Sequence, residues 1–130
     1  MLFLDSSYLI GLLIEKDSLH QNALKLVPYL ENENKIINST VLTEVLNSLK
    51  VNNYSYTFDY VLNNLMNVEK LDFLSSEDYM DSIDIFKFYN FSINFSDCTI
   101  LKSMRTYQIN TIVSFDSDFD KIHGIERVFF

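Results

Sequence analysis

Short runs rich in apolar residues alternate with longer stretches of helical periodicity, and this alternation constrains the fold of the chain more than any other feature. Such runs are typical of strands that are buried on both faces of a parallel sheet. Strands separated by helices pair in parallel, because the right-handed crossover between them needs about a dozen residues. The sequence therefore predicts an α/β fold with a central, mostly parallel sheet of about five short strands flanked by helices. The predicted strands are Leu2–Leu4, Lys35–Asn38, Val68–Leu74, Thr111–Ser114 and Val128–Phe130.

Side chains that can cap helices stand in front of most periodic stretches, where they accept hydrogen bonds from the first free backbone N–H groups. Pro28 falls late in the second helix and is expected to bend or shorten it. The segment Val51–Asn53 is predicted to end the third helix. The predicted helices follow Ser6 or Ser7, Asp17 or Ser18, Ser39 or Thr40, Ser75 or Ser76, and Ser96, and two more cover Tyr54–Met66 and Asp118–Ile122.

Length and composition predict one domain that spans residues 1–130. The chain has 130 residues, of which 48% are hydrophobic, so it can fill a core of ordinary size. It contains only two Gly and one Pro, and we find no repeat or low-complexity linker. No apolar stretch approaches the roughly 20 residues that span a bilayer, and no signal-peptide pattern is present. The single Cys98 forms no internal disulfide, which favours a reducing, cytoplasmic location.

The formal net charge of −8 at pH 7 limits the kinds of partner that the protein can bind. A protein that holds nucleic acid on a broad surface is basic, because neutralisation of phosphates dominates that kind of affinity. Lys102 and Arg105 are the densest basic pair, so a DNA-packaging or sequence-reading role is not expected. A metal-dependent nuclease is compatible with an acidic chain, since bound cations supply local positive charge. The acidic balance also suits a basic partner protein.

Four acidic residues stand at points where the local sequence pattern changes: Asp5, Glu44, Asp97 and Asp116. Asp5 and Asp116 follow apparent strands, whereas Glu44 and Asp97 lie near the starts of apparent helices. In an open parallel sheet, ligands bind outside the carboxyl ends of the strands. If the sheet brings the four side chains together, they form an oxygen-only pocket for a hard divalent cation such as Mg²⁺ or Mn²⁺. Such a pocket suits metal-assisted cleavage of a phosphodiester bond.

Other kinds of site fit the sequence less well. Zinc prefers Cys and His ligands, but Cys98, His20 and His123 lie far apart and lack ligand spacing. The glycines, Gly11 and Gly124, form no Gly-rich phosphate-binding loop.

Four segments together resemble the PIN-domain family, and most closely its VapC-type toxins. They are Leu2–Ile10, Ser39–Leu46, Phe95–Ile100 and Ser114–Asp120, which occur in the family's order and cover nearly the whole chain. The resemblance implies a parallel sheet flanked by helices, a site for Mg²⁺ or Mn²⁺, and cleavage of RNA to products with a 5′-phosphate and a 3′-hydroxyl. It also implies a cognate antitoxin protein and a homodimer.

The resemblance further implies roles for individual residues. Asp118 matches the second acid of the family's Thr-x-Asp-x-Asp-Phe ending and is expected to assist at the metal site. Ser6 and Ser114 are expected to hold carboxylates in place by hydrogen bonds. Ser114 replaces the family's usual Thr, and Leu101 stands where some relatives carry a further acid. The expected catalytic and metal-site acids are Asp5, Glu44, Asp97 and Asp116, of which Glu44 either binds a metal or orients the attacking water.

Several functions remain open at this point. One alternative is a PIN-like nuclease of RNA processing or decay that has no antitoxin, and another is a non-catalytic binding module that keeps the fold. A receiver-like domain is disfavoured because no Lys follows Thr111–Val113. A phosphatase with an Asp nucleophile would need a second Asp where this chain has Ser7.

Simpler structural interpretations also apply to single residues. Asp97 and Asp118 each have the position of a helix cap, and Asp120 is expected to be solvated. The aromatic run Phe86–Phe91 is expected to lie in the core or at a dimer face rather than to stack on RNA bases. Four aromatic residues are expected either to line a groove for a partner or to pack a helical hairpin: Tyr54, Tyr56, Phe58 and Tyr60.

Overall fold

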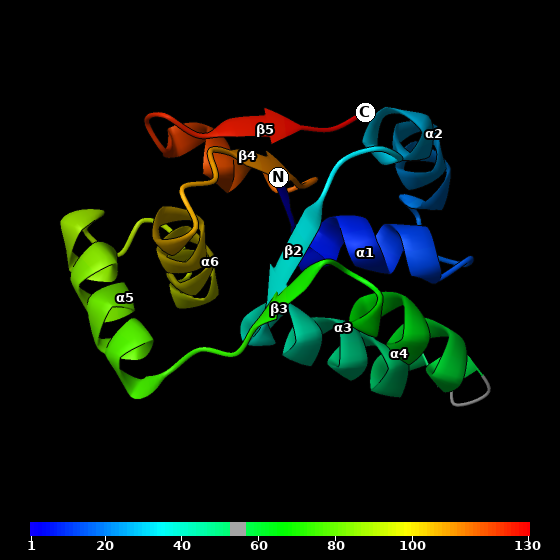
Figure 1. Cartoon of the computed structure of the whole chain (residues 1–130), viewed down its shortest axis with the longest axis horizontal. Helices are drawn as coiled ribbons and strands as arrows, with labels where there is room; N and C mark the ends of the chain where they lie inside the picture. The colour runs from blue at the N-terminus through cyan, green and yellow to red at the C-terminus, as the bar shows by residue number, and fades with distance from the viewer. Residues whose placement is uncertain (53–56) are drawn as a thin grey trace.

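The computed structural model describes residues 1–52 and 57–130. Among these residues, five strands form one sheet in the order β3-β2-β1-β4-β5, and every neighbouring pair is parallel (Figure 1). The predicted α/β class with a parallel sheet is therefore confirmed. The strands are β1 (Leu2–Leu4), β2 (Lys35–Asn38), β3 (Lys70–Asp72), β4 (Thr111–Val113) and β5 (Glu126–Val128).

Helices flank this sheet. Figure 1 shows α5 and α6 beside each other on one side of the sheet, with α1 to α4 on the other. In the described part of the chain, none of the helices is long and apolar enough to cross a membrane. The helices are α1 (Ser6–Leu13), α2 (His20–Leu30), α3 (Ser39–Asn52), α4 (Phe58–Met66), α5 (Ser76–Phe88), α6 (Phe95–Thr106) and the 3-10 helix η2 (Ser117–Lys121).

The strand order reverses next to β1. The chain passes from β1 outward to β2 and β3, and then returns through α5 and α6 to β4, which lies on the other side of β1. The carboxyl ends of β1 and β4 are therefore neighbours, with Leu4 opposite Val113. Such a reversal point is where ligands bind in open α/β sheets, because the following loops diverge there.

The core is centred on the inner strands. Phe3, Ile36, Ile37, Ile112 and Val113 are fully buried, as the apolar runs of the sequence predict for strands covered on both faces. The aromatic run of α5 behaves differently, because Phe88 and Phe91 are exposed. Part of that run therefore lies outside the core, and a dimer contact there stays a prediction.

Buried Asn38 starts α3, in place of the predicted caps Ser39 and Thr40. Its Oδ1 accepts a hydrogen bond of 3.1 Å from the Val41 N–H. Its Nδ2 donates to the Thr99 carbonyl at 3.3 Å and to the Ser103 hydroxyl at 3.0 Å on α6. Asn38 therefore joins α3 to α6, which no local sequence pattern shows.

Other predicted helix starts also shift. Ser75 caps α5 through a capping box with Asp78, as one of the two predicted choices. Ser96 does not cap α6, because the helix begins one residue earlier at Phe95, after Asn94. The second helix begins at His20, because the Asp17 carboxylate accepts a hydrogen bond from the Leu19 N–H and closes a turn before the helix.

Several predicted boundaries are wrong by a few residues. The third strand is shorter than Val68–Leu74, and the last strand ends at Val128 rather than beginning there. The helix predicted over Tyr54–Met66 begins at Phe58 in the described part, whereas residues 54–56 lie outside it. Tyr54 and Tyr56 therefore also lie outside the described residues, whereas Phe58 and Tyr60 are exposed on α4, and the partner groove stays a prediction. Helix α3 runs to Asn52, although the segment Val51–Asn53 is predicted to end it. Pro28 does not end α2, which continues to Leu30.

Candidate metal centre

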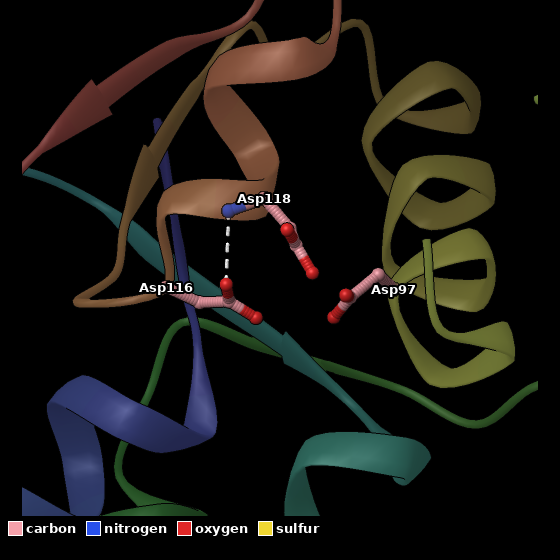
Figure 2. A group of neighbouring side chains, drawn as sticks. All are labelled: Asp97, Asp116 and Asp118. Carbon is pink, nitrogen blue, oxygen red and sulfur yellow. Dashed lines mark hydrogen bonds between the residues drawn. The ribbon is translucent and has the colours of Figure 1, made fainter. Parts of the chain in front are cut away.

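Three carboxylates converge beside the carboxyl ends of β1 and β4. One oxygen each of Asp97, Asp116 and Asp118 lies within 4.8 Å of the others (Figure 2). Figure 2 shows Asp97 on α6 facing the other two acids, which come from the start of η2. The spacing and the oxygen-only donor set fit a hard divalent cation.

Asp116 and Asp118 are fixed in position by the turn that follows β4. The Asp116 side chain accepts a hydrogen bond of 2.9 Å from the Asp118 N–H and so caps η2. The Asp116 N–H in turn donates to the Ser114 hydroxyl at 3.0 Å. Asp116 is therefore a helix cap as well as a member of the acid cluster, and its capping bond does not exclude the predicted functional role.

Asp97 is the acid whose surroundings most directly favour a bound cation. The residue is only 6% exposed, and its Oδ2 is buried without a hydrogen-bond partner among the described residues. Burial, followed by the charges of Asp116, Asp5, Glu44 and Asp118, raises the pKa of Asp97 to about 7. An unpaired buried carboxylate oxygen is costly unless something neutralises it. A cation held between these acids would supply that partner.

Asp5 stands at the end of β1 and is held firmly. Its Oδ2 accepts hydrogen bonds from the Ser114 hydroxyl at 2.6 Å and from the Ser7 hydroxyl at 2.8 Å. Its own N–H donates to the Val113 carbonyl at 3.0 Å. Burial raises the pKa of Asp5, although hydrogen bonds from Ser114, Ser7 and the Ser6 backbone oppose this shift. Asp5 occupies the N-cap position of α1, in place of the predicted caps Ser6 and Ser7, but its side chain makes no capping bond to the helix.

Ser7 is a site residue that the sequence does not predict. Its oxygen accepts a hydrogen bond of 3.0 Å from the Phe115 N–H while its hydroxyl hydrogen is donated to Asp5. Ser114 has the matching arrangement, accepting from the Asp116 N–H and donating to Asp5. Each hydroxyl has one hydrogen, so the Ser7 and Ser114 oxygens, 3.3 Å apart, are in contact without a hydrogen left to share. The predicted supporting role of Ser114 is seen here, and Ser7 doubles it.

Glu44 extends from α3 toward the same cluster. It is half-buried, and burial raises its pKa, followed by the negative charge of Asp5, while a hydrogen bond from the Ser6 hydroxyl lowers it. The role of Ser6 in holding a carboxylate stays a prediction, and this contact points to Glu44 as that carboxylate. Asp5 and Glu44 are not members of the tight group of three, which instead includes Asp118.

Two basic residues complete the surroundings of the cluster. Lys121 forms an ion pair of 2.9 Å with Asp118. Arg127 on β5 donates two hydrogen bonds of 2.9 Å to Asp120, and its Nη1 donates to the Ser114 carbonyl at 3.2 Å. Asp120 is exposed, as predicted, but it anchors η2 to β5. The Lys121–Asp118 pair has local i,i+3 spacing, whereas the bonds that Arg127 makes have no signature in the local sequence.

Comparisons with known proteins identify the family of the chain. The sequence model of the PIN domain matches residues 2–125, and the chain belongs to the PIN-domain family. Ribonuclease VapC6 of Methanocaldococcus jannaschii is 28% identical over 147 aligned residues, which cover 97% of this chain and 95% of that relative. The resemblance drawn from the four sequence segments is therefore confirmed.

Two solved structures share the fold over 100% of both chains. The toxin VapC20 of Mycobacterium tuberculosis, described as cleaving the sarcin-ricin loop, has a TM-score of 0.84 at 18% identity. VapBC2 of Rickettsia felis, solved with a DNA fragment from their promoter, contains a chain with a TM-score of 0.71 at 14% identity. At these identities the likeness concerns the fold.

Proposed function

We propose that this protein is a divalent-cation-dependent endoribonuclease of the VapC type. The observation that carries the proposal is the convergence of Asp97, Asp116 and Asp118 on one point, where a buried oxygen of Asp97 has no partner among the described residues. Membership of the PIN-domain family and the similarity to a ribonuclease named VapC6 support RNA as the substrate. The net charge of −8 fits a site that relies on a cation rather than on a basic groove.

Asp97, Asp116 and Asp118 would hold Mg²⁺ or Mn²⁺, with Asp5 beside them. When bound, the cation supplies Lewis-acid chemistry that makes a water more acidic and offsets charge on the phosphoryl group. The protein's contribution is to hold the carboxylates in a fixed arrangement, so that little reorganisation is needed during the reaction. Ser7 and Ser114 do this for Asp5, and the capping bond does it for Asp116.

Glu44 is suited to a different task at the edge of the cluster. Its raised pKa makes the carboxylate a better proton acceptor than an exposed Glu, and the Ser6 hydroxyl fixes its orientation. We assign Glu44 to orienting the attacking water and taking its proton, as an alternative to direct cation binding. Water then replaces the 3′-oxygen at phosphorus, and the departing 3′-oxygen takes up a proton from solvent, which leaves a 5′-phosphate and a 3′-hydroxyl.

Cleavage of mixed cellular RNA tests this function. The purified protein is incubated with Mg²⁺, with Mn²⁺ and with a chelator, and the RNA ends are analysed. Asp5→Asn is expected to remove cleavage, whereas Asp84→Asn, which makes the same charge change at an exposed position on α5, is expected to leave it unchanged. Cleavage that persists in chelator or in Asp5→Asn contradicts the proposal.

We further propose a cognate antitoxin, a homodimer and a cytoplasmic location. The similarity to VapC proteins supports the antitoxin, and the acidic charge suits a basic partner. Co-expression with the product of an adjacent short reading frame should relieve growth arrest caused by this protein, and light scattering measures the oligomer. Growth arrest that no neighbouring product relieves would favour a nuclease of RNA processing instead.

A further inference from the structure

Lys121 forms an ion pair with one member of the acid cluster. Its Nζ is 2.9 Å from Oδ1 of Asp118, and the same Nζ donates to the Ser92 carbonyl at 3.5 Å. The Lys121 side chain is 53% exposed, so solvent reaches the ammonium group directly. A solvent-accessible positive charge therefore stands beside one member of the acid cluster.

The ammonium group and a bound cation compete for the same carboxylate. While no cation is present, Lys121 offsets part of the negative charge that Asp97, Asp116 and Asp118 share. A divalent cation on Asp118 would weaken this attraction and repel the ammonium group. Exposed ion pairs contribute little to stability, so the pair can open at little cost.

The ammonium group of Lys121, once released from Asp118, could attract a phosphate of the RNA backbone. The scissile phosphate must lie at the acid cluster, and a chain of net charge −8 repels the RNA backbone elsewhere. A lysine binds a phosphate as a flexible point charge, without the fixed two-pronged geometry of arginine. Lys121 has the reach and the exposure for this task.

We propose that Lys121 binds a phosphate of the RNA substrate beside the cut bond, after cation binding opens its ion pair with Asp118. The proposal rests on the proposed ribonuclease function and assigns a substrate-binding residue to it. It has a consequence that a purely structural role lacks. Removal of the Lys121 charge should strengthen cation binding and weaken RNA binding, which are changes of opposite sign.

Cation binding is measured first, by calorimetric titration of the metal-free protein with Mn²⁺. Lys121→Gln is expected to lower the Kd for Mn²⁺ by roughly 3- to 10-fold. Lys25→Gln, the same charge change at an exposed position on α2, serves as the matched control and should leave Kd unchanged. Wild type that binds no Mn²⁺ would contradict the proposed function itself. Binding in wild type that Lys121→Gln does not strengthen beyond the control would contradict this inference alone.

RNA binding is measured next, from the cleavage rate as a function of RNA concentration. Lys121→Gln is expected to raise KM by roughly 3- to 10-fold with kcat within about 2-fold, and to reduce the salt dependence of log KM by about 0.7 per lost phosphate contact. Lys121→Arg keeps the charge and should restore both KM and the Mn²⁺ affinity. An unchanged KM in Lys121→Gln, or a KM that Lys121→Arg fails to restore, would overturn the proposal.

Discussion

The Ser114 hydroxyl donates a hydrogen bond of 2.6 Å to Oδ2 of Asp5 and so joins two strand ends that are 109 positions apart in the chain. Parallel pairing of β1 with β4 sets this relationship. Leu4 stands opposite Val113, so the residues that follow them, Asp5 and Ser114, leave the sheet at the same edge. The sheet thus places the first acid of the chain beside the turn that carries Asp116 and Asp118. The site is a direct consequence of the strand order.

Ser114→Ala is expected to weaken both the fold and the site. It removes a donor to Asp5 and leaves the Asp116 N–H without its acceptor, so unfolding should become easier by about 1–2 kcal/mol. Loss of the support for both acids should also lower activity by roughly 10- to 100-fold. Urea unfolding and RNA cleavage measure the two effects. Ser117→Ala, at an exposed position of η2, is the control, and equal behaviour of the two variants would refute the supporting role.

The strand ends are the part of the site that the sequence predicts well. Asp5 follows a fully apolar strand and Asp116 follows another, and the sheet order then brings them together. The sequence gives two interpretations of Asp97, a site acid or a helix cap. The capping interpretation is wrong, because Asn94 rather than Asp97 stands at the cap position of α6. The sequence predicts only an assisting role for Asp118, yet the structure places it in the tight group with Asp97. This convergence depends on how η2 lies relative to α6, which no local pattern shows.

The partners that hold the site together are not visible in the sequence. Ser7 serves Asp5 only because Phe115 and Ser114 come close after folding. Arg127 reaches Asp120 across the turn between η2 and β5, and such pairing depends on side-chain direction rather than on spacing. Strand boundaries at the sheet edges also shift, because edge strands such as β3 and β5 are only half covered and have weaker apolar patterns.

Asp97→Asn is expected to stabilise the cation-free protein at neutral and higher pH. The pKa of Asp97 is raised from 3.8 in the unfolded chain to about 7, so between these values the folded protein keeps a proton that the unfolded chain releases. The contribution of Asp97 to stability is therefore full below the unfolded pKa and is lost as pH rises through the folded pKa. Asn mimics the protonated acid and avoids this loss, which we place at no less than about 1–2 kcal/mol.

Thermal unfolding in chelator at about pH 5 and about pH 8 measures this effect, with a gap of roughly 4 °C expected at the higher pH. Asp84→Asn controls for the change of net charge, since Asp84 is exposed on α5. A large loss of stability in Asp97→Asn at both pH values would show that Asp97 has a structural role instead.

Arg127→Gln is expected to destabilise the protein more than Asp120→Asn does. The Arg127 side chain is only 8% exposed and also donates to the Ser114 carbonyl, whereas the Asp120 side chain is 55% exposed. We expect a cost of about 1–3 kcal/mol for Arg127→Gln and less than about 1 kcal/mol for Asp120→Asn. Arg127→Lys should recover little of the lost stability, because lysine lacks the two-pronged geometry that meets Asp120. Denaturant unfolding measures all three variants, with exposed Arg105→Gln as the control. Equal costs for Arg127→Gln and Asp120→Asn would assign the whole effect to the ion pair.

Paired measurement of Mn²⁺ binding and RNA cleavage on the same protein samples tests the proposed metal centre most directly. In wild type, the cleavage rate should rise in step with Mn²⁺ occupancy. A concentration of about 100 times Kd should add about 2.7 kcal/mol to the free energy of unfolding. Asp97→Asn should remain folded and lose the binding, the stabilisation and the cleavage together. Cleavage at the wild-type rate in Asp97→Asn, or cleavage in wild type that does not depend on Mn²⁺ or Mg²⁺, would contradict the assignment of this acid cluster as the catalytic metal site.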